Sequence, residues 1–133
     1  MPFLQRAVIA ATAIVFCAGP ANARGGSYSG AWPVTITGSQ FGNGTGCLTL
    51  TQNASGGSAS LVFDNQKYPY GSFVVVNGIL VANITEPLYG QNGALMFIAH
   101  ASHGHIGKGV YENIEGGSNF DFGALSFGMK NGC

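Results

Sequence analysis

"VVVNGILVA", residues 74–82, sets Asn77 and Gly78 between two apolar runs. Asn and Gly both tolerate the positive φ of a type I′ turn, so this stretch predicts a two-residue β-hairpin. Val74 would then lie opposite Val81, and both faces of the hairpin would be apolar. One face can cover the domain core, whereas the other has to meet a second layer of the chain, another subunit or a ligand.

The rest of the chain repeats this pattern of short apolar runs bounded by Gly, Asn, Ser and Pro. No segment has sustained helical periodicity. The pattern predicts eight strands, at residues 32–37, 47–52, 59–63, 72–76, 79–84, 94–100, 105–113 and 120–129. Eight short strands at this spacing predict an all-β domain, built as a single antiparallel barrel or sandwich.

The first residues have the pattern of a secretory signal peptide. Arg6 precedes an apolar run at residues 7–19, and Ala21-Asn22-Ala23 supplies a cleavage site. The run is too short for a membrane span, and no later run is longer. We therefore expect a cleaved signal peptide at residues 1–23, a flexible leader at 24–29 and the all-β domain at 30–133. The protein would be secreted or periplasmic.

The cysteine content predicts a disulfide, and the charge content excludes one class of partner. Cleavage would remove Cys17, leaving Cys47 and Cys133 as the only cysteines of an exported chain, so they are expected to form a disulfide. The chain has five Lys and Arg residues and five Asp and Glu residues. Because no basic cluster is available to neutralise phosphates, nucleic acid is excluded as a partner.

The first predicted strand starts with Gly30-Ala31-Trp32, which contains the only tryptophan. These residues resemble the G-x-W with which the calycin group of small exported barrels begins, among them lipocalins, avidins and bacterial metalloprotease inhibitors. The likeness covers these three residues, together with strand number, chain length and export. It implies an eight-stranded up-and-down barrel in which Trp32 packs across one end, and it implies no particular ligand.

The stretch "HASHGHIGKG", which begins at His100, contains all three histidines. His enters the left-handed backbone region more readily than most residues, so a two-residue turn at His103-Gly104 is expected between two antiparallel strands. Ser102 would face His105 across this hairpin. His100 would then be a diagonal neighbour of His105 on the same face.

In the same register Met96 faces Tyr111, and Glu112 points to the opposite face from His100 and His105. Three interpretations of the histidines stay open: ordinary turn and surface residues, a metal site, or a contact that responds to pH because histidine ordinarily titrates near pH 6.5. Two imidazoles fall short of the three or four ligands of zinc sites, so no specific metal site is expected.

No catalytic motif is present: the chain lacks G-x-S-x-G, H-E-x-x-H, a phosphate-binding glycine loop and EF-hand spacing. We therefore expect no enzyme and no cofactor, but a binding module for a small apolar ligand or a partner protein. The candidate binding residues are Trp32, Tyr111, His100 and His105. One alternative is a structural surface or envelope protein that forms a homo-oligomer through the hairpin from Phe73 to Ile84. Another is a metal-dependent enzyme at the histidine hairpin.

Overall fold

The structure is a computed structural model that describes residues 27–38, 43–88, 91–115 and 118–133. The chain forms nine strands, in the order β1 (Gly30–Gly38), β2 (Asn43–Asn53), β3 (Gly56–Phe63), β4 (Gln66–Tyr68), β5 (Gly71–Val76), β6 (Ile79–Leu88), β7 (Gln91–Ser102), β8 (His105–Glu115) and β9 (Ser118–Phe127). Among the described residues there is no helix able to cross a membrane. The expected signal peptide and the first part of the expected leader lie outside the described residues.

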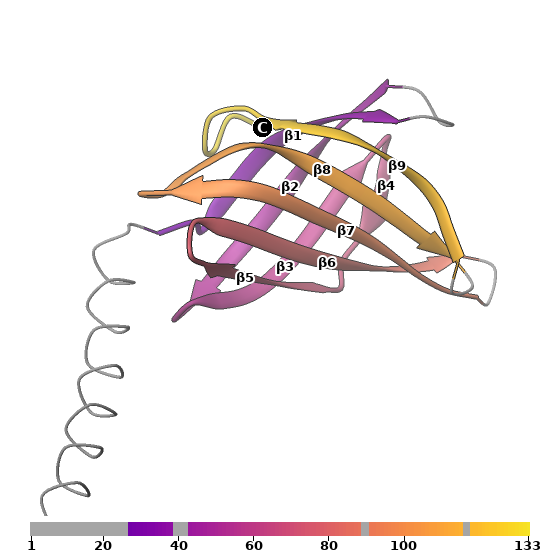
Figure 1. Ribbon diagram of the computed structural model, residues 1–133, viewed down its shortest axis with the longest axis horizontal. Coiled ribbons are helices and arrows are strands. Elements are labelled where there is room, and N and C mark those ends of the chain that lie inside the picture. The colour runs from indigo at the N-terminus through magenta and orange to yellow at the C-terminus, as the bar shows by residue number, and fades with distance from the viewer. Residues whose placement is uncertain (1–26, 39–42, 89–90, 116–117) are drawn as a thin grey trace, which may run out of the picture.

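Eight of the strands close into an antiparallel barrel (Figure 1). β1 pairs with β2, β2 with β3 and β3 with β5, and each later strand pairs with the next as far as β9. β9 pairs back onto β1 and completes the ring. The predicted all-β class is confirmed, and of the two architectures that we considered the chain adopts the barrel. The remaining strand, β4, is not part of the ring and pairs only with β3.

The hairpin of β5 and β6 has the predicted register. Val74 lies opposite Val81, and the turn residues Asn77 and Gly78 have φ angles of 52° and 77°. Leu80 is buried inside the barrel, whereas Val74 is 46% exposed on its outside. Hence, among the described residues, no second layer of the chain covers the other apolar face of this hairpin.

The barrel interior is a packed apolar core to which every barrel strand contributes. Inward side chains alternate with outward ones along the strands, as the pleat of a β-strand requires, apart from an irregularity in β8. One fully or nearly fully buried example from each of the eight strands, in chain order, is Trp32, Leu48, Leu61, Phe73, Leu80, Phe97, Ile106 and Leu125.

Two links differ from the sequence-based expectation. The stretch "TQNASGGSAS", residues 51–60, predicts a longer loop between the second and third strands, but the structure has a tight turn at Ala54-Ser55. A Cβ on Gly57 would lie 1.9 Å from the backbone oxygen of Thr51, so the glycine belongs to a closely paired strand. The short strand β4 was not predicted at all. It follows a tight turn at Asp64-Asn65, where both residues have positive φ.

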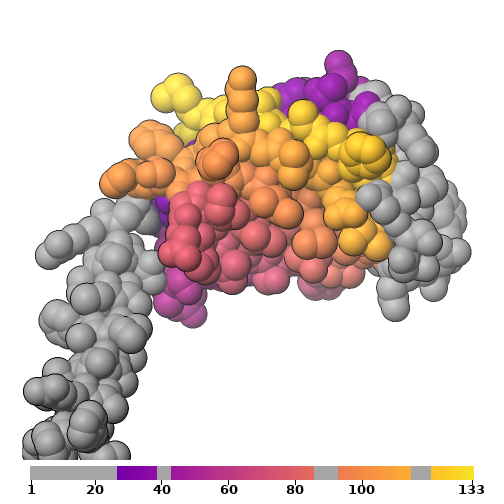
Figure 2. Space-filling view, in the orientation of Figure 1, coloured from indigo at the N-terminus to yellow at the C-terminus, as the bar shows by residue number. Residues whose placement is uncertain are grey.

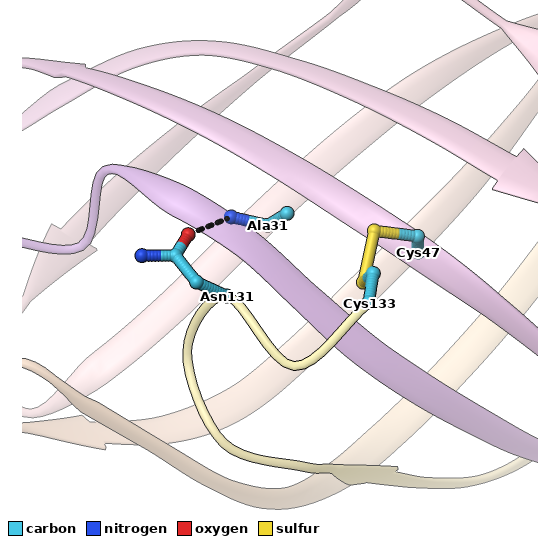
Figure 3. Close-up of a disulfide and its surroundings, with 4 residues drawn as sticks. All are labelled: Ala31, Cys47, Asn131 and Cys133. Carbon is cyan, nitrogen blue, oxygen red and sulfur yellow. Dashed lines mark hydrogen bonds between the residues drawn. A yellow bond between two sulfur atoms is a disulfide. The ribbon is translucent and has the colours of Figure 1, made fainter.

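After β9 the chain turns back and crosses β1 to reach β2 (Figure 3). Asn131 donates its backbone N–H to the oxygen of Ala31 at 2.6 Å, and its side-chain oxygen accepts the N–H of Ala31 at 3.0 Å. Cys133 then meets Cys47, with 2.14 Å between the sulfur atoms, as the cysteine count predicted. The last strand was expected to continue to residue 129, but it ends at Phe127 because this tail leaves the sheet there.

Candidate ligand-binding site at one end of the barrel

A pocket of about 560 Å³ opens at the end of the barrel where β1 begins. Three segments that are distant in sequence form it: the start of β1 with the residues before it, the turn between β7 and β8, and the C-terminal tail. The barrel closure brings these segments together, since β9 ends beside β1 and the β7–β8 turn lies at the same end.

Apolar side chains form the walls of the pocket. Trp32 is 2% exposed, Phe127 is half-buried, and Met129 from the tail is exposed. The indole N–H of Trp32 donates to the backbone oxygen of Tyr28 at 2.9 Å, which fixes the orientation of the ring. The ring is therefore held rigidly at the base of the pocket, and Phe127 and Met129 are the apolar side chains that a ligand can contact.

The residues just before β1 help to build the pocket. Tyr28 is buried, and its backbone N–H donates to the side-chain oxygen of Gln52 at 2.7 Å. Ser29 accepts the N–H of Gln52 through its hydroxyl at 2.8 Å. Residues 27–29, which were expected to belong to a flexible leader, are thus packed against the barrel. Burial of the Tyr28 ring and the hydrogen bonds to Gln52 offset the conformational entropy that these residues lose.

Basic side chains form the rim of the pocket. Lys130 donates to the backbone oxygen of Ser27 at 2.6 Å, and its Nζ lies 5.9 Å from the centre of the Trp32 ring, within the range of a cation–π contact. His103 and His105 are exposed at the opposite segment of the lining. The described lining contains no Asp or Glu. Lys130 therefore supplies the ammonium group of a pocket whose described lining has no carboxylate.

The turn that presents these histidines has the predicted form. His103 and Gly104 have φ angles of 51° and 78°, and Ser102 faces His105. The Oγ of Ser102 lies 2.7 Å from Nδ1 of His103 and shares a hydrogen bond with it. This hydrogen bond restricts the His103 ring beside the mouth of the pocket.

Beyond this turn the predicted register is wrong by one residue. An irregularity between Ala99 and Ala101 adds a residue to β8, so Tyr111 faces Phe97 instead of Met96. Gly109 permits the irregularity, because a Cβ there would lie 2.0 Å from the backbone oxygen of Ile98.

This shift moves side chains between the two faces of β8. Tyr111 points into the barrel, where it is 5% exposed. Glu112 lies opposite Met96 and so shares the outer face with His100, contrary to our expectation that it points to the opposite face.

The four expected binding residues are therefore divided among three places. Trp32 and His105 meet in the pocket, His100 is exposed on the outer wall, and Tyr111 lies in the core. Sequence reasoning missed Lys130, which contacts a residue 103 positions earlier in the chain. No local pattern marks a contact of such long range.

Tyr111 lies beside two buried polar residues inside the barrel, Asp121 and Asn113. Its hydroxyl donates to Oδ2 of Asp121 at 2.5 Å, and Asp121 is 2% exposed. Burial, and then this hydrogen bond and the carboxylate charge, raise the pKa of Tyr111 well above its usual value. Asn113 lies opposite Asp121, and its Oδ1 has no hydrogen-bond partner among the described residues.

Comparisons with protein-family models, with curated proteins and with solved structures find no match. Within the described residues, no three His, Cys, Asp or Glu side chains gather closely enough to hold a metal ion. A functional proposal therefore has to rest on the geometry of the pocket.

Proposed function

We propose that this protein is an exported, non-enzymatic β-barrel that binds a small organic anion with an apolar body in the pocket at the end of the barrel. The observation that carries the proposal is a pocket that combines two accessible apolar side chains, Phe127 and Met129, with the ammonium group of Lys130 and has no acidic residue in its described lining. The pocket volume of about 560 Å³ falls in the range of small-molecule sites.

The two parts of the pocket suit the two parts of such a ligand. Burial of an apolar ring against Phe127 and Met129 supplies affinity through the hydrophobic effect. Lys130 is placed to pair with a carboxylate or sulfonate at the mouth, where an exposed pair contributes about 1 kcal/mol. The rim therefore supplies selectivity for anions, and the walls supply most of the affinity.

Export is part of the proposal and is supported by two sequence features. Residues 1–23 have the pattern of a cleaved signal peptide, and a disulfide between Cys47 and Cys133 suits an oxidising compartment.

Two fluorescent probes with similar aromatic bodies test the proposal. Anilinonaphthalene sulfonate carries a negative charge, whereas N-phenylnaphthylamine is neutral. Because Trp32 is the only tryptophan, energy transfer from it reports a bound probe, and the effect of Phe127→Ala shows whether the probe lies in the pocket. We expect one-to-one binding of the anionic probe. Lys130→Gln should weaken that binding several-fold and change binding of the neutral probe by less than twofold, whereas Phe127→Ala should weaken both.

Lys67→Gln is the matched control, because Lys67 is an exposed lysine on β4 and does not line the pocket. It should leave the affinity for both probes unchanged. Two results would contradict the proposal: no saturable energy transfer from Trp32, or equal effects of Lys130→Gln and Lys67→Gln on the anionic probe.

A further inference from the structure

Met129 lies in the C-terminal tail with its backbone held in place and its side chain exposed. Gly128, just before it, donates its N–H to the oxygen of Pro33 at 2.8 Å, and Gly132 donates its N–H to the oxygen of Met129 at 2.9 Å. The Met129 side chain is nevertheless 85% exposed, and it lines the pocket. The thioether is therefore presented to solvent at a fixed position of the backbone.

The tail lies at the outer surface of the pocket end of the barrel. In Figure 2 atoms of the tail, in yellow, project at the upper left, above the orange tip of the hairpin of β7 and β8. Both segments belong to the lining of the pocket. A chemical change in the Met129 side chain would therefore alter the mouth of the pocket and leave the buried core unchanged.

The other methionine in the described part of the chain has a different environment. Met96 is partly buried on β7, opposite Glu112, and it does not line the pocket. Oxidation of sulfur side chains by dissolved oxidants depends on how far the sulfur is exposed. We therefore expect Met129 to react before Met96.

A hydroperoxide can oxidise a thioether without a catalytic group in the protein. A lone pair of the sulfur attacks one oxygen of hydrogen peroxide, the O–O bond breaks, and the second oxygen leaves as water. The sulfur is oxidised by two electrons, which the peroxide takes up. The product is methionine sulfoxide, which is polar and chiral, and sulfoxide reductases convert it back to methionine.

We propose that Met129 is a site of reversible oxidation at which a hydroperoxide lowers the affinity of the pocket for its ligand. This inference rests on the proposed function, in which Phe127 and Met129 are the apolar side chains that a ligand contacts. A ligand that covers the sulfoxide would have to remove water from a strong hydrogen-bond acceptor, which costs free energy. Because the side chain is exposed, the folded state should tolerate the change.

Treatment with hydrogen peroxide, followed by peptide mass spectrometry, tests which methionine reacts. We expect Met129 to gain one oxygen atom several-fold faster than Met96. The oxidised protein should bind both anilinonaphthalene sulfonate and N-phenylnaphthylamine several-fold more weakly, because both probes have apolar bodies. Methionine sulfoxide reductases should restore both affinities. Urea unfolding should give the same stability before and after oxidation.

Two variants show whether Met129 causes the loss of affinity. In Met129→Leu the affinity for each probe, whatever its starting value, should not change on treatment with peroxide. Met96→Leu is the matched control, because Met96 lies away from the pocket: it should keep the native affinities and the full response to peroxide.

The outcomes separate this inference from the proposed function. Oxidation of Met96 as fast as Met129, or native affinities after Met129 is fully oxidised, would overturn the oxidation site alone. An untreated protein that binds neither probe would overturn the proposed function, and the oxidation site with it.

Discussion

At Gly30 the backbone has a φ of 146°, which side chains with a Cβ rarely adopt. The C-terminal tail also lies against this position: an added Cβ would be 2.8 Å from the side-chain oxygen of Asn131 and 2.9 Å from Cγ of Lys130. The glycine of the Gly30-Ala31-Trp32 start is therefore required because the tail crosses there, and the same tail carries Lys130 to the pocket.

Gly30→Ala should lower the free energy of unfolding by about 1–3 kcal/mol, through both strain and displacement of the tail. Gly107→Ala is the matched control, because its added Cβ would meet only His100, at an ordinary distance of 3.7 Å. Urea unfolding followed by Trp32 fluorescence measures both. Equal stabilities of the two variants would show that the tail does not require glycine at residue 30.

The buried pair of Tyr111 and Asp121 makes stability depend on pH in the alkaline range. The raised pKa of Tyr111 means that the folded state holds the phenol proton more tightly than the unfolded chain does. The contribution of Tyr111 is thus fully present below pH about 10, the ordinary value for tyrosine, and it is lost as pH rises above that value.

Tyr111→Phe should lower the free energy of unfolding by about 1–3 kcal/mol at neutral pH, because Asp121 loses a buried hydrogen-bond donor. It should also remove the Tyr111 part of the alkaline loss, so the stability of the variant falls less steeply above pH 10. Urea unfolding at several pH values measures this slope. Tyr70→Phe, at a 70% exposed side chain, is the control and should keep the native slope. A native slope in Tyr111→Phe would contradict the assignment.

Among the elements, the C-terminal tail connects stability with the ligand site. The disulfide of Cys133 with Cys47 spans 86 residues and holds the tail across β1, while Met129 and Lys130 of the tail line the pocket. Cross-linking a loop of this length stabilises a fold by up to about 4–5 kcal/mol in the chain-entropy model. Loss of the disulfide should also release Met129 and Lys130 from their positions in the pocket.

The double variant Cys47→Ser, Cys133→Ser should therefore lower the free energy of unfolding by up to about 4 kcal/mol. It should also weaken binding of anilinonaphthalene sulfonate several-fold in conditions where the barrel is still folded. Denaturant unfolding and probe titration measure the two effects. Native probe affinity in a folded double variant would show that the tail does not need the disulfide to shape the site.

Tight turns, and the hairpin register that the Asn77-Gly78 turn sets, could be predicted from the sequence, whereas an irregularity within a pair of strands could not. The turns at Asn77-Gly78 and His103-Gly104 follow from residues that tolerate positive φ. The irregularity at Ala99 is different, because it depends on how closely Gly109 can approach β7. A shift of one residue there exchanged the faces of Tyr111 and Glu112.

At the scale of the whole molecule, closure of the barrel creates the candidate site. Trp32 and His105 could be selected from the sequence, because a single tryptophan and a histidine cluster stand out locally. Lys130 could not, since only the pairing of β9 with β1 and the crossing of the tail bring it over Trp32. The basic rim is a property of the tertiary fold.

A proton–nitrogen NMR titration of the protein with anilinonaphthalene sulfonate tests the ligand site most directly. The signals to follow are the single indole N–H resonance of Trp32 and the backbone amide resonances of Gly104 and Gly128. All three residues line the pocket. We expect these resonances to shift together and to saturate at one probe per chain, with the shift reduced in Lys130→Gln. Saturable shifts confined to the outer wall of the barrel, at exposed residues such as Val110 on β8, with an unchanged Trp32 resonance, would contradict a ligand site at the end of the barrel.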